Sequence, residues 1–183
     1  MLDNQQPHWK DNLYYEQDFC PHYGEKVKVG KYQIFAGGSL YLTSEDIKKF
    51  DLLIPLARFV PVKIGQRKQV LGCPWIDLKR PPKGFREFLI QHVIPELDKG
   101  TRILVYCEGG HGRTGTFLAA LIALLESDVH DPIAEVRNRY CQNAVETLEQ
   151  AEAIFALREE ELPKKYVEEF PLISKLGFPP FLP

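Results

Sequence analysis

The chain has 183 residues, of which 44% are hydrophobic and 26% charged, which is the composition of one globular domain. Its formal net charge of −2 excludes a global basic field for nucleic acid or an anionic membrane, so any attraction for an anionic substrate must be local. The four cysteines form no Cys-x-x-Cys zinc or redox motif and no small-domain disulfide framework, which indicates a reducing compartment. The N-terminus lacks the apolar run of a signal peptide, and the longest apolar stretch is too short to cross a bilayer. We therefore expect a cytoplasmic monomer with no nucleic acid or membrane partner.

Strands and helices alternate along most of the sequence. The predicted strands are, in chain order, 26–29, 32–35, 51–57, 70–73 and 102–106. The predicted helices are a short one capped at Thr43 or Ser44, and then 83–98, 114–126, 131–140 and 147–157. Gly37 and Gly38 are expected to break the chain after the second strand, and Pro95 to interrupt the last turn of its helix.

This alternation predicts an α/β fold, a single domain whose largely parallel central sheet is flanked by helices on both faces. We expect an N-terminal extension over 1–25, a catalytic domain over 26–162, and an extended C-terminal tail over 163–183 that packs on the domain. The tail could alternatively dock a partner. Ligands of such sheets bind beyond the carboxyl ends of the strands, which is where Cys107 lies.

A glycine-rich loop between the strand 102–106 and the helix 114–126 holds a cysteine and an arginine separated by five residues. Cys107 opens this loop and Arg113 closes it. Glycines let the backbone turn so that several N–H groups point inward, and such a nest before a helix N-terminus binds a dianionic phosphate. The candidate phosphate-binding residues are Glu108, Gly109, Gly110, His111, Gly112 and Arg113.

Each end of this loop has a chemical use. A helix N-terminus and a neighbouring guanidinium favour the nucleophilic thiolate form of a cysteine. The planar fork of Arg113 can hold two phosphate oxygens, and the charge that develops on them, in the transition state. The hydroxyl of Thr114 can donate to the sulfur and ease departure of the thiolate. Two alternative interpretations are that Cys107 is a buried structural cysteine or that the loop is a nucleotide-binding turn. Either one would require the arginine and the glycines to be present by coincidence.

The pattern Cys-x-x-Gly-x-x-Arg-Thr, with Gly110 as its inner glycine, resembles the phosphate loop of the protein tyrosine phosphatase superfamily, and its dual-specificity branch fits best. The resemblance extends over 32–157 and implies a phosphatase acting through a phosphocysteine intermediate. It also implies an aspartate acid about thirty residues before the nucleophile. Asp77 lies 30 residues before Cys107, in a proline-rich loop, while Asp98 is a second candidate at a helix end.

The roles of two further residues and of one group of basic residues are left open by the sequence. Gln150 either orients the hydrolytic water, as in some relatives, or only completes a capping box with Thr147. Tyr106 replaces the histidine that usually precedes the nucleophile, which leaves the degree of thiolate activation open. The residues Lys79, Arg80, Lys83 and Arg86 form either a basic lip beside Asp77 or a solvated face.

The expected substrate is a phosphorylated protein or a small phosphomonoester, and no metal or other cofactor is required because the loop and Arg113 supply the positive charge. Acidic Glu108 argues against highly charged inositol lipids. Two other classes stay open. One is a non-catalytic phosphate-binding module, and the other is a rhodanese-like sulfur transferase, whose cysteine loop does not need the Arg113–Thr114 pair.

Overall fold

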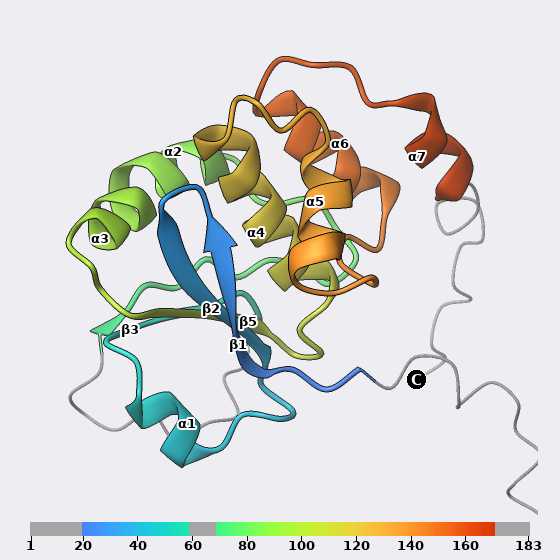
Figure 1. Ribbon diagram of the computed structural model, residues 1–183. Coiled ribbons are helices and arrows are strands. Elements are labelled where there is room, and N and C mark those ends of the chain that lie inside the picture. Colours follow the sequence, from blue (N-terminus) through green and yellow to red (C-terminus); the bar gives the residue numbers. More distant parts are fainter. Residues whose placement is uncertain (1–19, 59–68, 171–183) are drawn as a thin grey trace, which may run out of the picture.

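In the computed structural model, residues 20–58 and 69–170 are described, and they form a five-stranded sheet beneath a layer of helices (Figure 1). The strands lie in the order β1-β2-β5-β3-β4. Only β1 and β2 pair antiparallel, and the other neighbours are parallel. The strand bounds are Tyr23–Val29 (β1), Tyr32–Gly38 (β2), Leu52–Pro55 (β3), Gln69–Val70 (β4) and Ile103–Cys107 (β5). The predicted α/β class with a largely parallel sheet is therefore confirmed.

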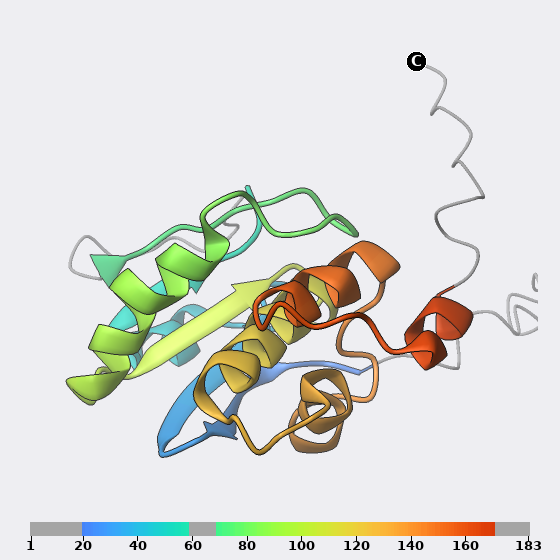
Figure 2. The same ribbon diagram turned by 90° about the horizontal axis from the view of Figure 1, so that it is seen from above.

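Helices cover both faces of this sheet, but unequally. Helices α2 to α6 lie on one face and the short α1 lies on the other (Figure 1), while α3 and α7 occupy opposite ends of the helical layer (Figure 2). No helix in the described ranges is long and apolar enough to cross a membrane. The helix bounds are Ser44–Lys48 (α1), Phe85–Phe88 (α2), Ile94–Asp98 (α3), Gly112–Leu125 (α4), Pro132–Arg139 (α5), Leu148–Ala156 (α6) and Lys164–Glu169 (α7).

The central strand β5 directs its side chains alternately to the two faces, as a strand buried on both sides must. Ile103, Val105 and Cys107 belong to the main hydrophobic core, which packs against α4. Leu104 and Tyr106 belong to a smaller core with residues of α1. The nucleophile candidate therefore faces the helical layer, while Tyr106 faces away from it.

The helix predicted over 83–98 runs from Phe85 to Asp98 and continues through Pro95, so the interruption expected at this proline was wrong. A π-helical segment, Leu89–Val93, joins α2 to α3. Proline lacks an N–H and its ring collides with the carbonyl four residues earlier in a regular helix. A wider π turn before the proline relieves both problems, because it shifts the hydrogen-bond register by one residue.

Two other local expectations were also wrong. Gly37 and Gly38 do not break the chain, because they are the last residues of β2, and Gly38 is paired with Cys107 of β5. A side chain at Gly38 would lie 2.7 Å from the Gly109 carbonyl, so glycine is needed where the two segments meet. The tail after Pro163 is not extended throughout, because α7 forms there and buries Tyr166. Six residues are too few to show a helical period in the sequence.

Other expectations lie outside the described residues, including most of the N-terminal extension and the tail beyond residue 170, with its possible partner-docking role.

Candidate active site

The loop 107–113 connects β5 to α4 at the carboxyl edge of the parallel strands, as predicted. Gly110 adopts a φ of +89°, and a Cβ there would come within 3.0 Å of the Gly37 carbonyl carbon. Glycine is therefore required at this turn for both conformation and space. Helix α4 begins at Gly112 and receives no hydrogen bond from the side chain of its N-cap residue, His111. Its first N–H groups therefore depend on partners other than the cap side chain, which an anion or the carboxylate of another residue can supply.

Cys107 lies at the base of this loop and is 3% exposed. The Gly110 N–H donates to its Sγ at 3.2 Å, and its own backbone N–H donates to Thr114 Oγ1 at 2.9 Å. The Thr114 hydroxyl in turn donates to the Gly37 carbonyl at 3.4 Å. In this arrangement Thr114 fastens the nucleophile's backbone to β2, and its expected donation to the sulfur stays a prediction.

Arg113 is buried beside the loop and is surrounded by acceptors. Its Nη1 donates to the Trp75 carbonyl at 3.2 Å. Its Nε lies 3.0 Å from Asp77 Oδ1, and its Nη2 lies 3.5 Å from Glu108 Oε2. The structure therefore brings Cys107, Arg113 and Asp77 to one place, although 30 residues separate the aspartate from the cysteine in the sequence.

The segment that carries Asp77 is held against α6. Thr147 Oγ1 donates to the Leu78 carbonyl at 3.0 Å, and Leu78 adopts a strained φ of +61°. Lys79 pairs with Glu149 at 2.9 Å. Arg80 pairs with Glu152 at 3.1 Å. Half of the expected basic lip thus anchors this segment to α6 instead of facing a substrate.

Asp98, the alternative acid, lies away from the site. It ends α3 and accepts a hydrogen bond from Tyr32 at 2.6 Å, with Lys31 at 3.2 Å. Tyr32 begins β2, whereas Cys107 pairs with the last residue of that strand. Asp98 therefore lies at the opposite end of β2 from Cys107.

Sequence reasoning missed Glu146, which reaches the phosphate loop. Its carboxylate accepts a hydrogen bond from the Gly112 N–H, and a Cβ at Gly112 would lie 2.0 Å from Glu146 Oε2. Burial, and then the negative charge of Asp77, raise the pKa of Glu146 to about 7. The acid is therefore half ionised near neutral pH, beside the N–H groups expected to hold phosphate.

Strained backbone directs Glu146 toward the loop. The preceding Val145 has a φ of +64°, which is costly for a β-branched residue. Arg137 holds this turn by donating to the Ala144 carbonyl at 3.0 Å and the Val145 carbonyl at 3.1 Å. The segment's sequence carried no signal of this turn, because β-branched residues rarely adopt a positive φ.

Gln150 is fully buried and its amide lies at the same loop. Its Oε1 accepts from the Glu146 N–H at 2.9 Å, while Nε2 has no hydrogen-bond partner among the described residues. That nitrogen lies 3.2 Å from the position of a Cβ on Gly112. Gln150 also donates its backbone N–H to Thr147, so it serves the helix start as well as facing the loop.

A second group of side chains lies on the other side of His111. The side chains of Cys20, His22, His111 and Cys141 place their sulfur and nitrogen atoms within 4.8 Å of one another. No short motif signals this group, because 121 positions separate its two cysteines. It is the place in the described chain where a metal ion could be held.

Three solved structures have the same fold as this chain. The active form of Tk-PTP superposes with a TM-score of 0.60 at 22% identity, over 74% of this chain and 97% of that one. DUSP15 gives a TM-score of 0.59 at 18% identity, over 85% and 98%. Human DUSP28 gives 0.57 at 16% identity, over 76% and 96%. The chain therefore has the fold of these proteins.

Residues 62–170 match the family PTP-SAK, described as the Swiss Army Knife protein DSP-PTPase phosphatase domain. The chain belongs to this family. It is 36% identical over 93 residues to the uncharacterized protein MJ0215 of Methanocaldococcus jannaschii, covering 51% of this chain and 57% of that protein. It is 38% identical over 94 residues to MJECL20 of the same organism, covering 51% and 60%. The chain thus matches less than two thirds of the length of these relatives.

Proposed function

We propose that the protein is a cysteine-dependent phosphomonoester hydrolase of the tyrosine and dual-specificity type, which acts through a phosphocysteine intermediate. One observation carries the proposal. The Sγ of Cys107 lies at the base of a loop whose Gly110 N–H donates to it, in front of the N-terminus of α4, where the N-cap side chain makes no cap hydrogen bond. Within the same site, the buried guanidinium of Arg113 lies 3.0 Å from Asp77.

In the first step, the thiolate of Cys107 attacks phosphorus and the bond from phosphorus to the leaving oxygen breaks. Arg113 and the loop N–H groups hold the three non-bridging oxygens, which displace the carboxylates of Asp77 and Glu108 from the guanidinium. Asp77 donates its proton to the leaving oxygen. Its position supports this assignment, because its carboxyl lies 3.0 Å from the guanidinium proposed to hold the phosphate.

In the second step, water attacks the phosphocysteine, Asp77 accepts a proton, and the thiolate and inorganic phosphate are released. The Nε2 of Gln150 has no hydrogen-bond partner among the described residues, which supports a role for this residue in orienting that water. The Glu146 carboxylate occupies the neighbouring Gly112 N–H and must yield it when a phosphate binds.

The charges around the loop favour substrates with a single phosphate. Glu108, Asp77 and Glu146 place three carboxyl groups near Arg113. Lys79 and Arg80 are paired with α6. A substrate with several phosphates would meet more negative than positive charge here. We infer a phosphorylated protein side chain or a small phosphomonoester as the substrate.

The test is hydrolysis of p-nitrophenyl phosphate with reductant and without added metal. Cys107→Ser is expected to abolish vanadate-sensitive turnover, and Asp77→Asn to lower kcat about 10²- to 10⁴-fold because general acid catalysis is lost. The exposed Asp128→Asn is the matched control and should keep wild-type turnover.

Other outcomes identify the rival classes. Vanadate or phosphate binding without turnover between pH 5 and 7 would make the protein a phosphate-binding module. Thiosulfate turnover without phosphatase activity would indicate a sulfur transferase.

A further inference from the structure

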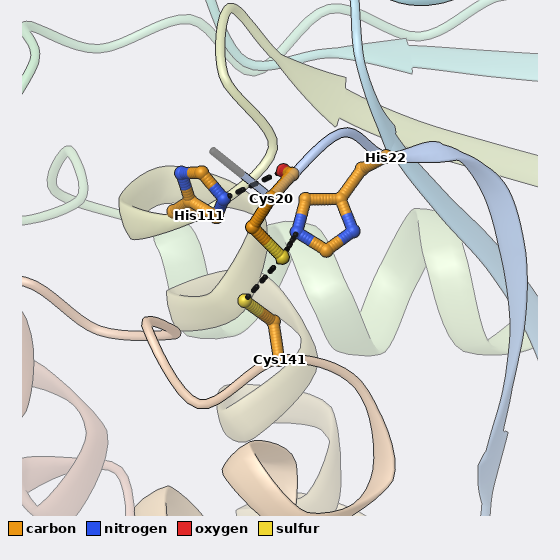
Figure 3. A group of neighbouring side chains, drawn as sticks. All are labelled: Cys20, His22, His111 and Cys141. Atoms are coloured by element: carbon orange, nitrogen blue, oxygen red, sulfur yellow. Dashed lines mark hydrogen bonds between the residues drawn. The ribbon is translucent and has the colours of Figure 1, made fainter. Parts of the chain in front are cut away.

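Four potential metal ligands converge beside the phosphate loop from three separate segments. Cys20 and His22 immediately precede β1, His111 belongs to the loop 107–113, and Cys141 lies between α5 and α6 (Figure 3). The Cys20 sulfur has dashed contacts to His22 and Cys141, and a third dashed line joins His111 Nε2 to the Cys20 carbonyl oxygen at 3.1 Å. His111 must release this oxygen to offer Nε2 to a metal. His22 and Cys141 are buried, and Cys20 and His111 are half-buried.

The spacing of these atoms fits a tetrahedral zinc site. Bonds of about 2.3 Å to sulfur and about 2.0 Å to nitrogen place neighbouring ligand atoms about 3.3–3.8 Å apart. Cys20 Sγ lies 3.7 Å from Cys141 Sγ and 3.3 Å from His22 Nε2. The two sulfurs are free thiols, well beyond the length of a disulfide bond. The widest spacing of 4.8 Å needs to shorten by about 1 Å to complete the coordination sphere.

His22 has the outer partner that metal-binding histidines usually have. Its Nδ1, on the opposite side of the ring from the sulfur, lies 3.4 Å from Glu25 Oε2. Both of these atoms are buried, and neither has a hydrogen-bond partner among the described residues. A carboxylate on the far ring nitrogen fixes the tautomer that presents Nε2 to a metal.

We propose that Cys20, His22, His111 and Cys141 bind one Zn²⁺ ion, in a site distinct from the nucleophile Cys107. Two thiolates and two imidazoles form the ligand set typical of structural zinc, and both thiols lose their protons on binding. Two thiolates balance the charge of the ion, so the site adds little net field to the phosphate loop. The sequence pattern alone had predicted no metal.

The ion would tie the phosphate loop to two other segments. His111 directly follows Gly110, whose carbonyl accepts a hydrogen bond from Tyr140 at 2.7 Å. The Cβ of His22 also lies 3.0 Å from the position of a Cβ on Gly110. Cys141 begins the connection that leads to Glu146. A metal here would hold the outer side of the loop while leaving its inner side free for phosphate.

The first test is the zinc content of the purified full chain, with reductant and after desalting. About one zinc per chain is expected for the wild type and for the Cys107→Ser and Cys73→Ser controls, which keep all four ligands. The single variants Cys20→Ser and Cys141→Ser should lose most of it. With cobalt in place of zinc, the thiolate charge-transfer absorption should weaken in each of these two variants.

A second test leaves every ligand in place. Glu25→Gln should weaken zinc binding about 10- to 100-fold in competition with a chelator, because only the outer partner of His22 is altered. The exposed Glu45→Gln in α1 is the matched control and should not change the affinity. In the wild type, zinc at about one hundred times its Kd should raise the Tm of the chelator-treated protein by about 5 °C or more.

Three results would overturn the proposal. One is a wild-type chain with free thiols that neither binds zinc nor gains thermal stability from it. Another is equal zinc content in the wild type and in the double Cys20→Ser, Cys141→Ser variant, which would show adventitious binding. The third is a Cys20–Cys141 disulfide in protein purified without reductant, with no metal bound after reduction. Because these readouts do not use phosphatase activity, they are independent of the proposed reaction.

Discussion

Arg113 is 4% exposed and is held by a backbone carbonyl and two carboxylates. A buried guanidinium keeps its charge and presents several donors in one plane, whereas an ammonium group offers a single point of charge. The side chain is thus placed to exchange its carboxylate partners for two phosphate oxygens.

Replacing Arg113 with lysine should lower kcat/KM for p-nitrophenyl phosphate about 10²- to 10³-fold, because the paired contact to the transition state is lost. The matched control is Arg86→Lys on the exposed side of α2, which should leave kcat/KM unchanged. Steady-state kinetics measure both. Wild-type kcat/KM in Arg113→Lys would contradict the role given to the guanidinium.

Glu146 should make anion binding depend on pH near neutrality. Its pKa is about 7, so it is mainly protonated at pH 6 and mainly ionised at pH 8. The ionised form competes for the Gly112 N–H and repels a dianion. Tungstate should therefore bind about five- to tenfold more weakly at pH 8 than at pH 6, as measured by calorimetry.

In Glu146→Gln the side chain stays neutral, and this contribution to the pH dependence of tungstate binding should disappear. The exposed Glu160→Gln is the control and should keep the wild-type ratio. An equal ratio in Glu146→Gln and the wild type would assign the pH dependence to another group.

Helix α4 begins at the proposed phosphate site and needs a cap at its other end. Arg158, which follows α6, donates to four carbonyls near the end of α4 and just beyond it, those of Ile122, Ala123, Glu126 and Val129. The last carbonyls of a helix have no partner within the helix, so this guanidinium satisfies them.

Arg158→Lys should lower the free energy of unfolding by about 1–3 kcal/mol, because a single ammonium cannot reach all four carbonyls. Urea denaturation measures the change. The Arg86→Lys control should stay within about 0.5 kcal/mol of the wild type. A change of the same small size in Arg158→Lys would mean that water replaces the cap without cost.

On the scale of the whole molecule, Glu126 joins three distant parts of the chain. Its carboxylate accepts from the Gly30 N–H at 2.7 Å, in the β1–β2 turn. It also accepts from both terminal nitrogens of Arg139 in α5, at 2.6 and 2.8 Å. The hydrogen bonds from Arg139 lower the pKa of Glu126 below its ordinary value.

Glu126→Gln should lower the free energy of unfolding at pH 7 by about 1–3 kcal/mol, because Arg139 loses one of its two carboxylate partners and keeps only Glu135. Since the folded pKa of Glu126 is lowered, its ionisation stabilises the protein above the ordinary carboxyl pKa, and this contribution is lost as the pH falls through the folded value. The difference between the two proteins should therefore shrink below about pH 4 in thermal melts.

Glu45→Gln, which breaks an exposed pair with Lys48, is the matched control and should be nearly neutral. A constant difference between Glu126→Gln and the wild type at every pH would assign the loss to packing instead.

The sequence by itself determined the fold class, most of the elements and the loop that carries Cys107 and Arg113. These features depend on periodicity and on short covalent spacing, which a chain displays locally. Asp77 was also found from the sequence, through its spacing in a resemblance, and the structure places it beside Arg113. The catalytic roles, the domain limits, the monomeric state and the cytoplasmic location stay predictions.

Only the tertiary structure decided what surrounds that loop. Glu146 reaches Gly112 through a strained turn at Val145 that no propensity favours. The group around Cys20 and Cys141 exists because the ends of β1 and α5 meet beside the loop, across 121 positions of sequence. Such contacts depend on how whole elements pack. Residues that are far apart in the chain form no local sequence pattern from which their contact could be predicted.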